Sequence, residues 1–149
     1  MQNNSGVRIV PYKEELRAAI IETWEASVRA THDFLKIEDI NYYKSVVQQL
    51  DFSDFNVHCY LNINNEVAGF IGIAGNKLEM LFLAPQFIGK GYGKALLDFA
   101  IKVLNVTAVD VNEQNLVAVK FYENNGFKIY NRTDTDSEGK PFPIVQMKL

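Results

Sequence analysis

The chain has 149 residues, of which 48% are hydrophobic and 22% are charged, and its formal net charge at pH 7 is −3. This length suits one well-buried domain and is too short for two ordinary ones, so we expect a single domain over residues 1–149. The acidic balance argues against a general nucleic-acid-binding surface. The sequence has no basic-then-apolar leader and no apolar run that approaches the length of a membrane span, so we expect neither secretion nor membrane insertion.

Cysteine and histidine usage narrows the chemistry further. The one cysteine, Cys59, cannot form an internal disulfide, which fits a reducing cytoplasm as the location. Cys59 lies in a strand-like run, so we expect a small buried residue rather than a nucleophile, with its neighbour His58 on the opposite strand face. The two histidines, His32 and His58, are widely separated, and we predict no metal site.

The first half of the chain predicts a strand, two helices and a hairpin. Residues 1–6 are polar and precede the regular elements. Hydrophobic spacing then predicts, in order, a strand at Val7–Val10, a helix from about Lys13 into residues 23–30, a helix at Ile37–Leu50, and strands at Tyr60–Ile63 and Glu66–Ile73 joined by a turn at Asn64–Asn65. Trp24 lies on the inner face of the first helix, and we expect it in the core.

The second half alternates strands and helices before a final strand pair. The predicted elements are a strand at Leu78–Leu83 stopped by Ala84–Pro85, a helix from Gly93 to about Leu104, a strand at Val106–Val111, a helix from Asn115 to about Asn125, and strands at Phe127–Arg132 and Ile144–Leu149 around an acidic loop at Thr133–Pro143. The buried face of the helix that begins near Gly93 should carry Gly93, Leu96, Leu97, Ala100, Ile101 and Leu104. The fold class is therefore mixed α+β.

A glycine run is the most informative segment of the chain. Ile88-Gly89-Lys90-Gly91-Tyr92-Gly93-Lys94 has three alternate glycines between a strand and a helix. A helix start offers unpaired N–H groups and a positive dipole end, and glycines let an anion approach the backbone. Lys90 and Lys94 add positive charge. The segment therefore predicts a phosphate cradle, although a loop that only permits tight strand–helix packing is the alternative.

Two common phosphate motifs do not fit this run. A P-loop requires glycine at position 88 and Ser or Thr at position 95, where this chain has Ile88 and Ala95. A dinucleotide fingerprint requires glycine at position 94 or 96, where Lys94 and Leu96 stand. Neither motif is present.

The order of strand, proline and x-Gly-x-Gly-x-Gly opening a helix resembles the acyl-CoA-binding segment of the GNAT N-acetyltransferases. That family usually has Gln or Arg at the position of Ile88, so one side-chain contact is missing while the backbone contacts remain. A second segment follows about 30 residues later, in which Asn115-x-x-Ala-x-x-Phe-Tyr-x-x-x-Gly-Phe127 resembles the second signature of the family. Residues 30–35, 111–115 and 139–143 look like those of a small bacterial branch.

The resemblance implies a GNAT fold, in which a mixed sheet of about seven strands is flanked by about four helices. The implied order is strand, two helices, three strands, helix, strand, helix and two strands. The implied activity is direct transfer of the acetyl group of acetyl-CoA, a co-substrate, to a primary amine of a protein lysine or a small molecule. A non-catalytic acyl-CoA-binding or sensing module is the alternative function, and a homodimer is one assembly that the resemblance allows.

The resemblance also assigns roles to single residues. It implies that Tyr122 protonates the departing thiolate, against the alternative of a core tyrosine. It implies that the co-substrate contacts Leu81, Phe82, Leu83, Ile88, Gly89, Lys90, Gly91, Tyr92, Gly93, Lys94, Asn115 and Tyr122. Asn115 could equally serve as a helix cap, and the two roles can coexist.

The remaining roles concern the acceptor amine. A lysine-like amine is almost fully protonated at pH 7, so a base is required. Glu79 is the first candidate and Asp110 the second, although each could be an ordinary structural residue. His32 and Phe34 interrupt the helical pattern between the first two helices, and we predict that they contribute to the acceptor site.

Overall fold

The computed structural model describes residues 8–149. The predicted polar segment 1–6 and Val7 of the predicted first strand lie outside the described residues. Strand β1 (Arg8–Pro11) begins where the description begins. The remaining strands are β2 (Asn56–Leu61), β3 (Val67–Ala74), β4 (Lys77–Leu83), β5 (Ala108–Asn112), β6 (Lys128–Thr133) and β7 (Ile144–Lys148).

These strands form one seven-stranded sheet with the order β1-β2-β3-β4-β5-β7-β6. Among the strands of residues 8–149, β4 and β5 are the one parallel pair, and the other neighbours are antiparallel. The element order is the one that the sequence predicted, and the mixed sheet confirms the α+β class. The short turn predicted at Asn64–Asn65 is present, and Asn65 adopts a left-handed φ of 61° there.

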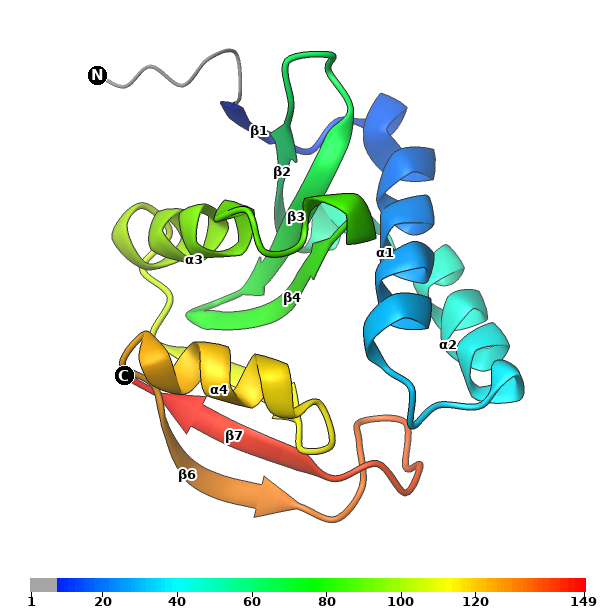
Figure 1. The fold of residues 1–149 in the computed structure, drawn as a ribbon, viewed down its shortest axis with the longest axis vertical. Helices are drawn as coiled ribbons and strands as arrows, with labels where there is room; N and C mark the ends of the chain where they lie inside the picture. Colours follow the sequence, from blue (N-terminus) through cyan, green and yellow to red (C-terminus); the bar gives the residue numbers. More distant parts are fainter. Residues whose placement is uncertain (1–7) are drawn as a thin grey trace.

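Two helices cover each face of the sheet (Figure 1). Helices α1 (Arg17–Thr31) and α2 (Ile37–Gln49) pack on one face, where Trp24 and Cys59 are buried in the same cluster. Helices α3 (Tyr92–Lys102) and α4 (Leu116–Asn124) pack on the other face. His58, next to Cys59 on β2, lies against Phe99 of α3, so the two neighbours face opposite sides as expected.

Helix boundaries differ slightly from the sequence prediction. The helix expected from Lys13 begins with a 3-10 turn at Glu14–Leu16 before α1, a common start for an α-helix. Helix α3 ends at Lys102 because the chain turns at Asn105, which has a φ of 61°. Leu104 therefore lies beyond the helix, although it still packs against the same core as Leu96 and Leu97.

Strand β4 carries a β-bulge. Gly72 and Ile73, adjacent residues of β3, pair with Met80 and Leu78, so Glu79 between these two has no partner in the ladder. Plain alternation would place Leu78 and Leu81 on opposite faces, yet both pack with the α3 cluster. The bulge therefore changes the phase of the strand at the residue predicted to be a base.

Strands β4 and β5 separate soon after they meet. They pair only through Lys77 with Ala108 and Leu78 with Val109, and neither strand pairs with the other beyond that point. In the described part of the chain, no helix combines the length and the apolar character needed to cross a membrane.

Candidate active site

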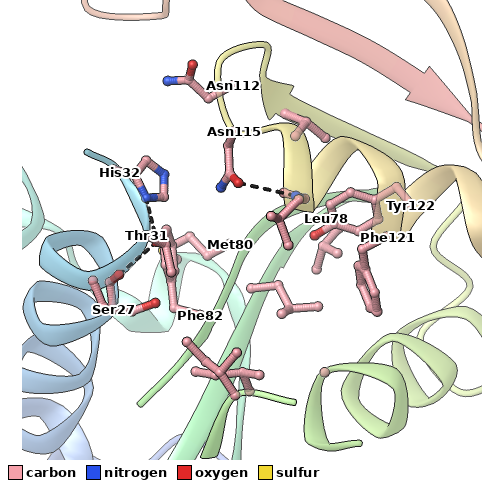
Figure 2. A pocket seen from close by; sticks show the side chains of 18 of the residues that line it. Ser27, Thr31, His32, Leu78, Met80, Phe82, Asn112, Asn115, Phe121 and Tyr122 are labelled. Atoms are coloured by element: carbon pink, nitrogen blue, oxygen red, sulfur yellow. Dashed lines mark hydrogen bonds between the residues drawn. The ribbon is translucent and has the colours of Figure 1, made fainter. Parts of the chain in front are cut away.

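A cavity of about 840 Å³ fills the space where β4 and β5 diverge. Its walls come from β4, the glycine loop, β5 and the first turns of α4, and from the end of α1 (Figure 2). Most of its surface is apolar. A cavity of this size at diverging strands is large enough for an extended ligand.

The glycine loop forms the end of the cavity at α3. Gly89 and Gly91 have φ values of 81° and 89°, a left-handed backbone that favours glycine. A Cβ atom built on either residue would meet nothing within 4 Å, so open space adjoins both. Gly91 caps α3 without a side-chain hydrogen bond, and the first N–H groups of the helix are left for a ligand. The loop therefore has the open backbone and the helix start that an anion cradle requires, and phosphate binding by it stays a prediction.

Side chains of the same segment divide into two groups. Ile88 and Lys94 line the cavity, whereas the side chains of Lys90 and Tyr92 are not part of its wall. Tyr92 instead packs against Tyr60, with ring centroids 4.9 Å apart. Lys94 Nζ lies 2.7 Å from Asp98 Oδ1, so its charge is partly balanced within α3. This pair was not predicted from the sequence, although its four-residue spacing is a known helical signal.

Tyr122 lies on the wall formed by α4. Its side chain is buried, and burial raises the pKa of the phenol well above its ordinary value. The Tyr122 hydroxyl makes no hydrogen bond with residues 8–149. Its oxygen is also not among the side-chain atoms of these residues that are fully buried without a hydrogen-bond partner. Figure 2 shows this hydroxyl pointing toward the cavity. The phenol is therefore a protonated donor that can reach a ligand.

Asn115 is the N-cap of α4. Its Oδ1 atom accepts a hydrogen bond from the Ala118 N–H at 3.2 Å, and the residue also lines the cavity. Asn112 lies just before it and accepts a bond from the Gln114 N–H at 3.3 Å. The capping role of Asn115 is thus present, and its amide N–H₂ group stays available to a ligand.

Glu79 lines the cavity at the bulge of β4. Although much of the side chain is exposed, desolvation raises the pKa of the Glu79 carboxyl; Lys77 opposes this shift and Asp110 adds to it. The Glu79 carboxylate makes no hydrogen bond and no ion pair with another side chain or backbone group of residues 8–149. A carboxylate with a raised pKa and a free lone pair suits proton transfer.

Asp110 lies on β5, across the gap from Glu79. Its Oδ2 atom accepts a hydrogen bond from Lys77 Nζ at 3.0 Å, while Oδ1 is buried and has no partner among the described residues. This ion pair raises the pKa of Lys77. One oxygen of Asp110 is occupied by the Lys77 ammonium and the other is buried, whereas the Glu79 carboxylate has no such partner, so the arrangement favours Glu79 as the base.

His32 and Phe34 occupy the turn between α1 and α2. His32 lines the cavity, whereas Phe34 lies beside it and packs against His32, with ring centroids 5.3 Å apart. Phe34 also contacts Phe142 of the β6–β7 loop (residues 134–143) at 6.1 Å between centroids. Phe34 therefore supports this end of the cavity from behind its wall.

The β6–β7 loop is attached to α2, although the two are far apart in sequence. The Tyr43 hydroxyl donates a hydrogen bond to Asp136, and Tyr42 donates one to Glu138 at 2.8 Å. Lys140 Nζ lies 4.1 Å from the centroid of the Tyr42 ring. These contacts hold the loop beside the α1–α2 turn, where Figure 1 shows the two segments together.

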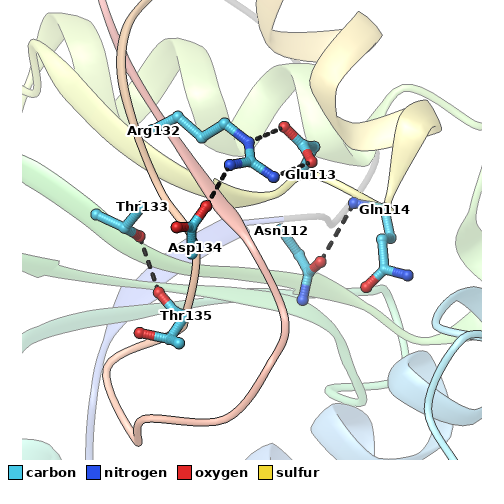
Figure 3. A network of polar contacts seen from close by, with 7 residues as sticks. All are labelled: Asn112, Glu113, Gln114, Arg132, Thr133, Asp134 and Thr135. Atoms are coloured by element: carbon cyan, nitrogen blue, oxygen red, sulfur yellow. Dashed lines mark hydrogen bonds and ion pairs between the residues drawn. The ribbon is translucent and has the colours of Figure 1, made fainter.

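A second set of contacts ties the β5–α4 turn to β6. Arg132 binds both carboxylate oxygens of Glu113, at 2.6 and 3.0 Å, and also Asp134 at 2.6 Å (Figure 3). The Glu113 N–H donates to the Pro143 carbonyl at 2.9 Å. The turn that carries Asn112 and Asn115 is thereby fixed to both ends of the β6–β7 loop.

Several residues of the site were not found from the sequence. Ser27 on α1 lines the cavity, and it belongs to a helix that the sequence identified only by its apolar face. Tyr43 and Asp136 are 93 positions apart, and no local pattern indicates such a contact. Among residues 8–149, no group of three or more His, Cys, Asp and Glu side chains is placed to hold a metal ion.

Comparison with known proteins gives one family and several relatives. The family described as "Acetyltransferase (GNAT) domain" matches residues 27–149. The chain is 36% identical over 132 residues to the peptidyl-lysine N-acetyltransferase YjaB of Salmonella typhimurium strain LT2, covering 86% of this chain and 88% of that relative. It is 32% identical over 128 residues to YjaB of Escherichia coli K12, covering 86% of each.

Solved structures with the same fold include two at more than 25% identity. The solution structure of apo-form YjaB from Escherichia coli has a TM-score of 0.87 and 30% identity, covering 95% of this chain and 96% of that one. The crystal structure of the PaiA N-acetyltransferase of Thermoplasma acidophilum, in complex with coenzyme A, has a TM-score of 0.73 and 26% identity, covering 96% and 99%.

Proposed function

The chain belongs to the GNAT acetyltransferase family, and we propose that the amine it acetylates is the side chain of a protein lysine. The enzyme transfers the acetyl group of acetyl-CoA to a primary amine. The observation that carries the lysine assignment is the relationship to two YjaB proteins, both named peptidyl-lysine N-acetyltransferases.

The proposed binding mode of acetyl-CoA uses the two ends of the cavity. The pyrophosphate is bound by backbone N–H groups of residues 89–94, where the open space beside Gly89 and Gly91 leaves room for it. The pantetheine arm lies along the free edge of β4 at Leu81, Phe82 and Leu83, with Asn115 on the opposite wall. Lys94, which lines the cavity, and Lys90 in the same loop add long-range attraction to phosphate.

The proposed chemistry is a direct transfer within the cavity. The amine nitrogen attacks the thioester carbonyl, the new C–N bond forms and the C–S bond breaks. Glu79 accepts the proton that the amine loses, and Tyr122 donates a proton to the departing thiolate. A lysine amine is neutral only about once in 2,500 molecules at pH 7, so the base also increases the reactive fraction.

Asp110 has a supporting role in this proposal. Its bond to Lys77 fixes the carboxylate, whose negative charge adds long-range attraction for the acceptor ammonium. His32 lines the cavity, and with Phe34 behind it forms the side of the acceptor site at the α1–α2 turn. We propose a cytoplasmic location, in line with the single cysteine.

The non-catalytic alternative has less support. A module that only binds or senses acyl-CoA has no need of a buried tyrosine whose hydroxyl faces the cavity. The relatives are themselves named as enzymes.

The test is an acetyl-CoA consumption assay with a panel of amines. The panel contains lysine peptides with blocked N-termini, matched arginine peptides, peptides with free N-termini, polyamines and aminoglycosides, and mass spectrometry locates the added acetyl group. We expect acetylation at the lysine Nε atom of the blocked peptides. Consumption only with polyamines or aminoglycosides would contradict the lysine assignment, and no consumption with any amine would support the binding module.

A further inference from the structure

A short chain of hydrogen bonds fixes the protonation of His32. The Thr31 hydroxyl donates to the Ser27 carbonyl oxygen at 2.7 Å, and the same hydroxyl oxygen lies 2.8 Å from His32 Nδ1 (Figure 2). A hydroxyl has one hydrogen, which the Ser27 carbonyl takes. The contact with His32 therefore requires that Nδ1 carry the hydrogen and donate it to Thr31.

The other ring nitrogen is then a bare acceptor. In a neutral imidazole with hydrogen on Nδ1, Nε2 carries a lone pair and no hydrogen. His32 lines the cavity, and Figure 2 shows the ring edge away from Thr31 on the side where Asn115 lies. Nε2 makes no hydrogen bond with residues 8–149, and it is not among their side-chain atoms that are fully buried without a partner. The lone pair is thus open to a ligand in the cavity.

The surroundings of His32 favour the neutral ring. Burial lowers its pKa below the ordinary value, and Asp33 in the same turn only partly opposes this. Phe34 and Phe82 pack on the ring, with centroids at 5.3 and 6.4 Å. The other charged groups that face this cavity are Glu79 on β4, Asp110 on β5 and Lys94 on α3.

We infer that His32 is the specificity-determining residue for the acceptor, because its Nε2 atom accepts a hydrogen bond from the acceptor nitrogen, and that Thr31 is the positioning residue that sets this tautomer. This inference rests on the proposed function, and it adds a role for each residue in binding and orienting the acceptor amine. A primary ammonium has three hydrogens: Glu79 takes one as a proton, and His32 accepts a second as a hydrogen bond. The nitrogen is then held with its lone pair directed to the thioester.

The pH dependence has a definite sign. The folded-state pKa of His32 is lowered, so the ring becomes charged only below its ordinary pKa of 6.5. A charged ring has no acceptor and repels an ammonium. The KM for the acceptor should therefore rise as the pH falls through this ionisation, while the KM for acetyl-CoA stays constant.

The experiment combines kinetics of four variants with NMR of the parent. His32→Phe keeps an aromatic ring against Phe34 and Phe82 but removes the acceptor. Thr31→Val removes the hydroxyl with little change in volume, and Thr31→Ser restores it. Thr23→Val is the matched control, because Thr23 on the same helix makes the same type of bond, to the Ala19 carbonyl at 2.7 Å, away from His32.

The variants should change the KM for the acceptor by different amounts. His32→Phe raises the acceptor KM about 10-fold or more, the range for losing a hydrogen bond to a charged group, and removes the rise in KM at low pH. Thr31→Val raises KM about 3-fold or more, and Thr31→Ser returns it to near the parent value. Thr23→Val changes thermal stability without changing the acceptor KM.

Nitrogen-15 NMR at neutral pH tests the tautomer without any turnover. We expect His32 to carry its hydrogen on Nδ1 in the parent and in Thr31→Ser, and to lose this preference in Thr31→Val. A hydrogen on Nε2 in the parent would overturn the inference, as would an unchanged acceptor KM in His32→Phe with normal acetyl-CoA binding.

Failure of the lysine assignment is a separate outcome. If the parent acetylates another primary amine instead, the same four variants are measured with that amine, and the role of His32 is judged from its KM. If the parent acetylates no amine, the NMR result alone decides the tautomer, and the selectivity role of His32 is rejected together with the proposed function.

Discussion

At the residue scale, the phenol of Tyr122 offers the sharpest test of the proposed chemistry. Burial keeps the hydroxyl protonated, and its oxygen faces the cavity without a protein partner among residues 8–149. Tyr122→Phe keeps the ring in the core and removes only the proton. We expect turnover to fall by about 10²–10⁴, the usual range for a positioned general acid, with acetyl-CoA affinity within a few-fold of the parent.

Steady-state kinetics and calorimetry measure the two quantities for Tyr122→Phe. Phe121, the neighbour on α4 that also lines the cavity, gives a comparison, since Phe121→Leu changes the wall without removing a proton donor. Turnover of Tyr122→Phe equal to that of the parent would remove Tyr122 from the mechanism.

The two cavity carboxylates differ in a way that pH can reveal. The pKa of Glu79 is raised above its ordinary 4.5, so the base becomes ionised, and kcat/KM rises, at a higher pH than for an ordinary glutamate. Glu79→Gln should lower kcat/KM by about 10²–10⁴ and remove or shift this rise. Asp110→Asn should lower kcat/KM less and keep the profile, because Lys77 already holds that carboxylate.

Stability provides the control for the Glu79 prediction. A raised carboxyl pKa means that the ionised form is disfavoured in the folded state, so stability is lost as the pH rises from 4.5 through the folded pKa. Glu79→Gln is therefore expected to melt at or above the parent temperature at pH 7. If Asp110→Asn loses the pH profile and Glu79→Gln keeps it, the ranking of the two carboxylates is wrong.

At the element scale, the start of α3 is the region where one added side chain should matter most. Gly91 has a φ of 89°, which L-residues with side chains rarely adopt, and it borders the open space of the cradle. Gly91→Asp adds backbone strain, a side chain in the phosphate path and a like charge. We expect calorimetry to detect no acetyl-CoA binding by this variant.

Gly139 provides the matched control for Gly91. It also has a left-handed φ, of 77°, and open space around it, but it lies in the β6–β7 loop. Gly139→Asp should bear similar strain and still bind acetyl-CoA. Normal binding by Gly91→Asp would show that the cradle is elsewhere.

The β6–β7 loop gives a second prediction at this scale. The Tyr43 hydroxyl bonds Asp136 in a partly buried contact, while the equivalent bond of Tyr42 to Glu138 is exposed. Tyr43→Phe should lower the melting temperature and raise the acceptor KM several-fold, since a bond to a charged group contributes about 1.5–3 kcal/mol and exposed bonds contribute less. Tyr42→Phe, the paired control, should change both by less. Equal effects of the two substitutions would mean that the Tyr43 bond does not order the acceptor side.

At the scale of the whole molecule, co-substrate binding should stabilise the fold. The cradle at residues 89–94 consists of backbone N–H groups at the start of α3, so acetyl-CoA should bind in the absence of an acceptor. A ligand at 100 times its Kd adds about 2.7 kcal/mol of stability to the form that binds it. We expect scanning calorimetry to show one unfolding transition, as for a single domain, that moves to higher temperature with acetyl-CoA. Two transitions, of which only one moves, would contradict the single domain.

Much of this architecture could be predicted from the chain because the signals are local. Glycines at alternate positions, the apolar stripe of α3 and the spacing of Asn115 and Tyr122 each act within a few turns of one element. Positions that depend on distant partners could not be predicted. The bulge at Glu79 depends on pairing with β3, the contact of Tyr43 with Asp136 depends on the folded loop, and the tautomer of His32 depends on a hydroxyl bonded to the preceding turn.

The short pairing of β4 with β5 has a consequence for the protein before it meets its ligand. Beyond two residue pairs, each strand presents an unpaired backbone edge inside the molecule. The free N–H and C=O groups of such an edge can pair with a strand of another protein, and proteins commonly cover these edges. Here helices block access to the two edges, since α3 and α4 lie over the opening on one face of the sheet and α1 lies over it on the other. The sheet therefore contains two internal edges that only an extended molecule narrow enough to enter between the helices can reach.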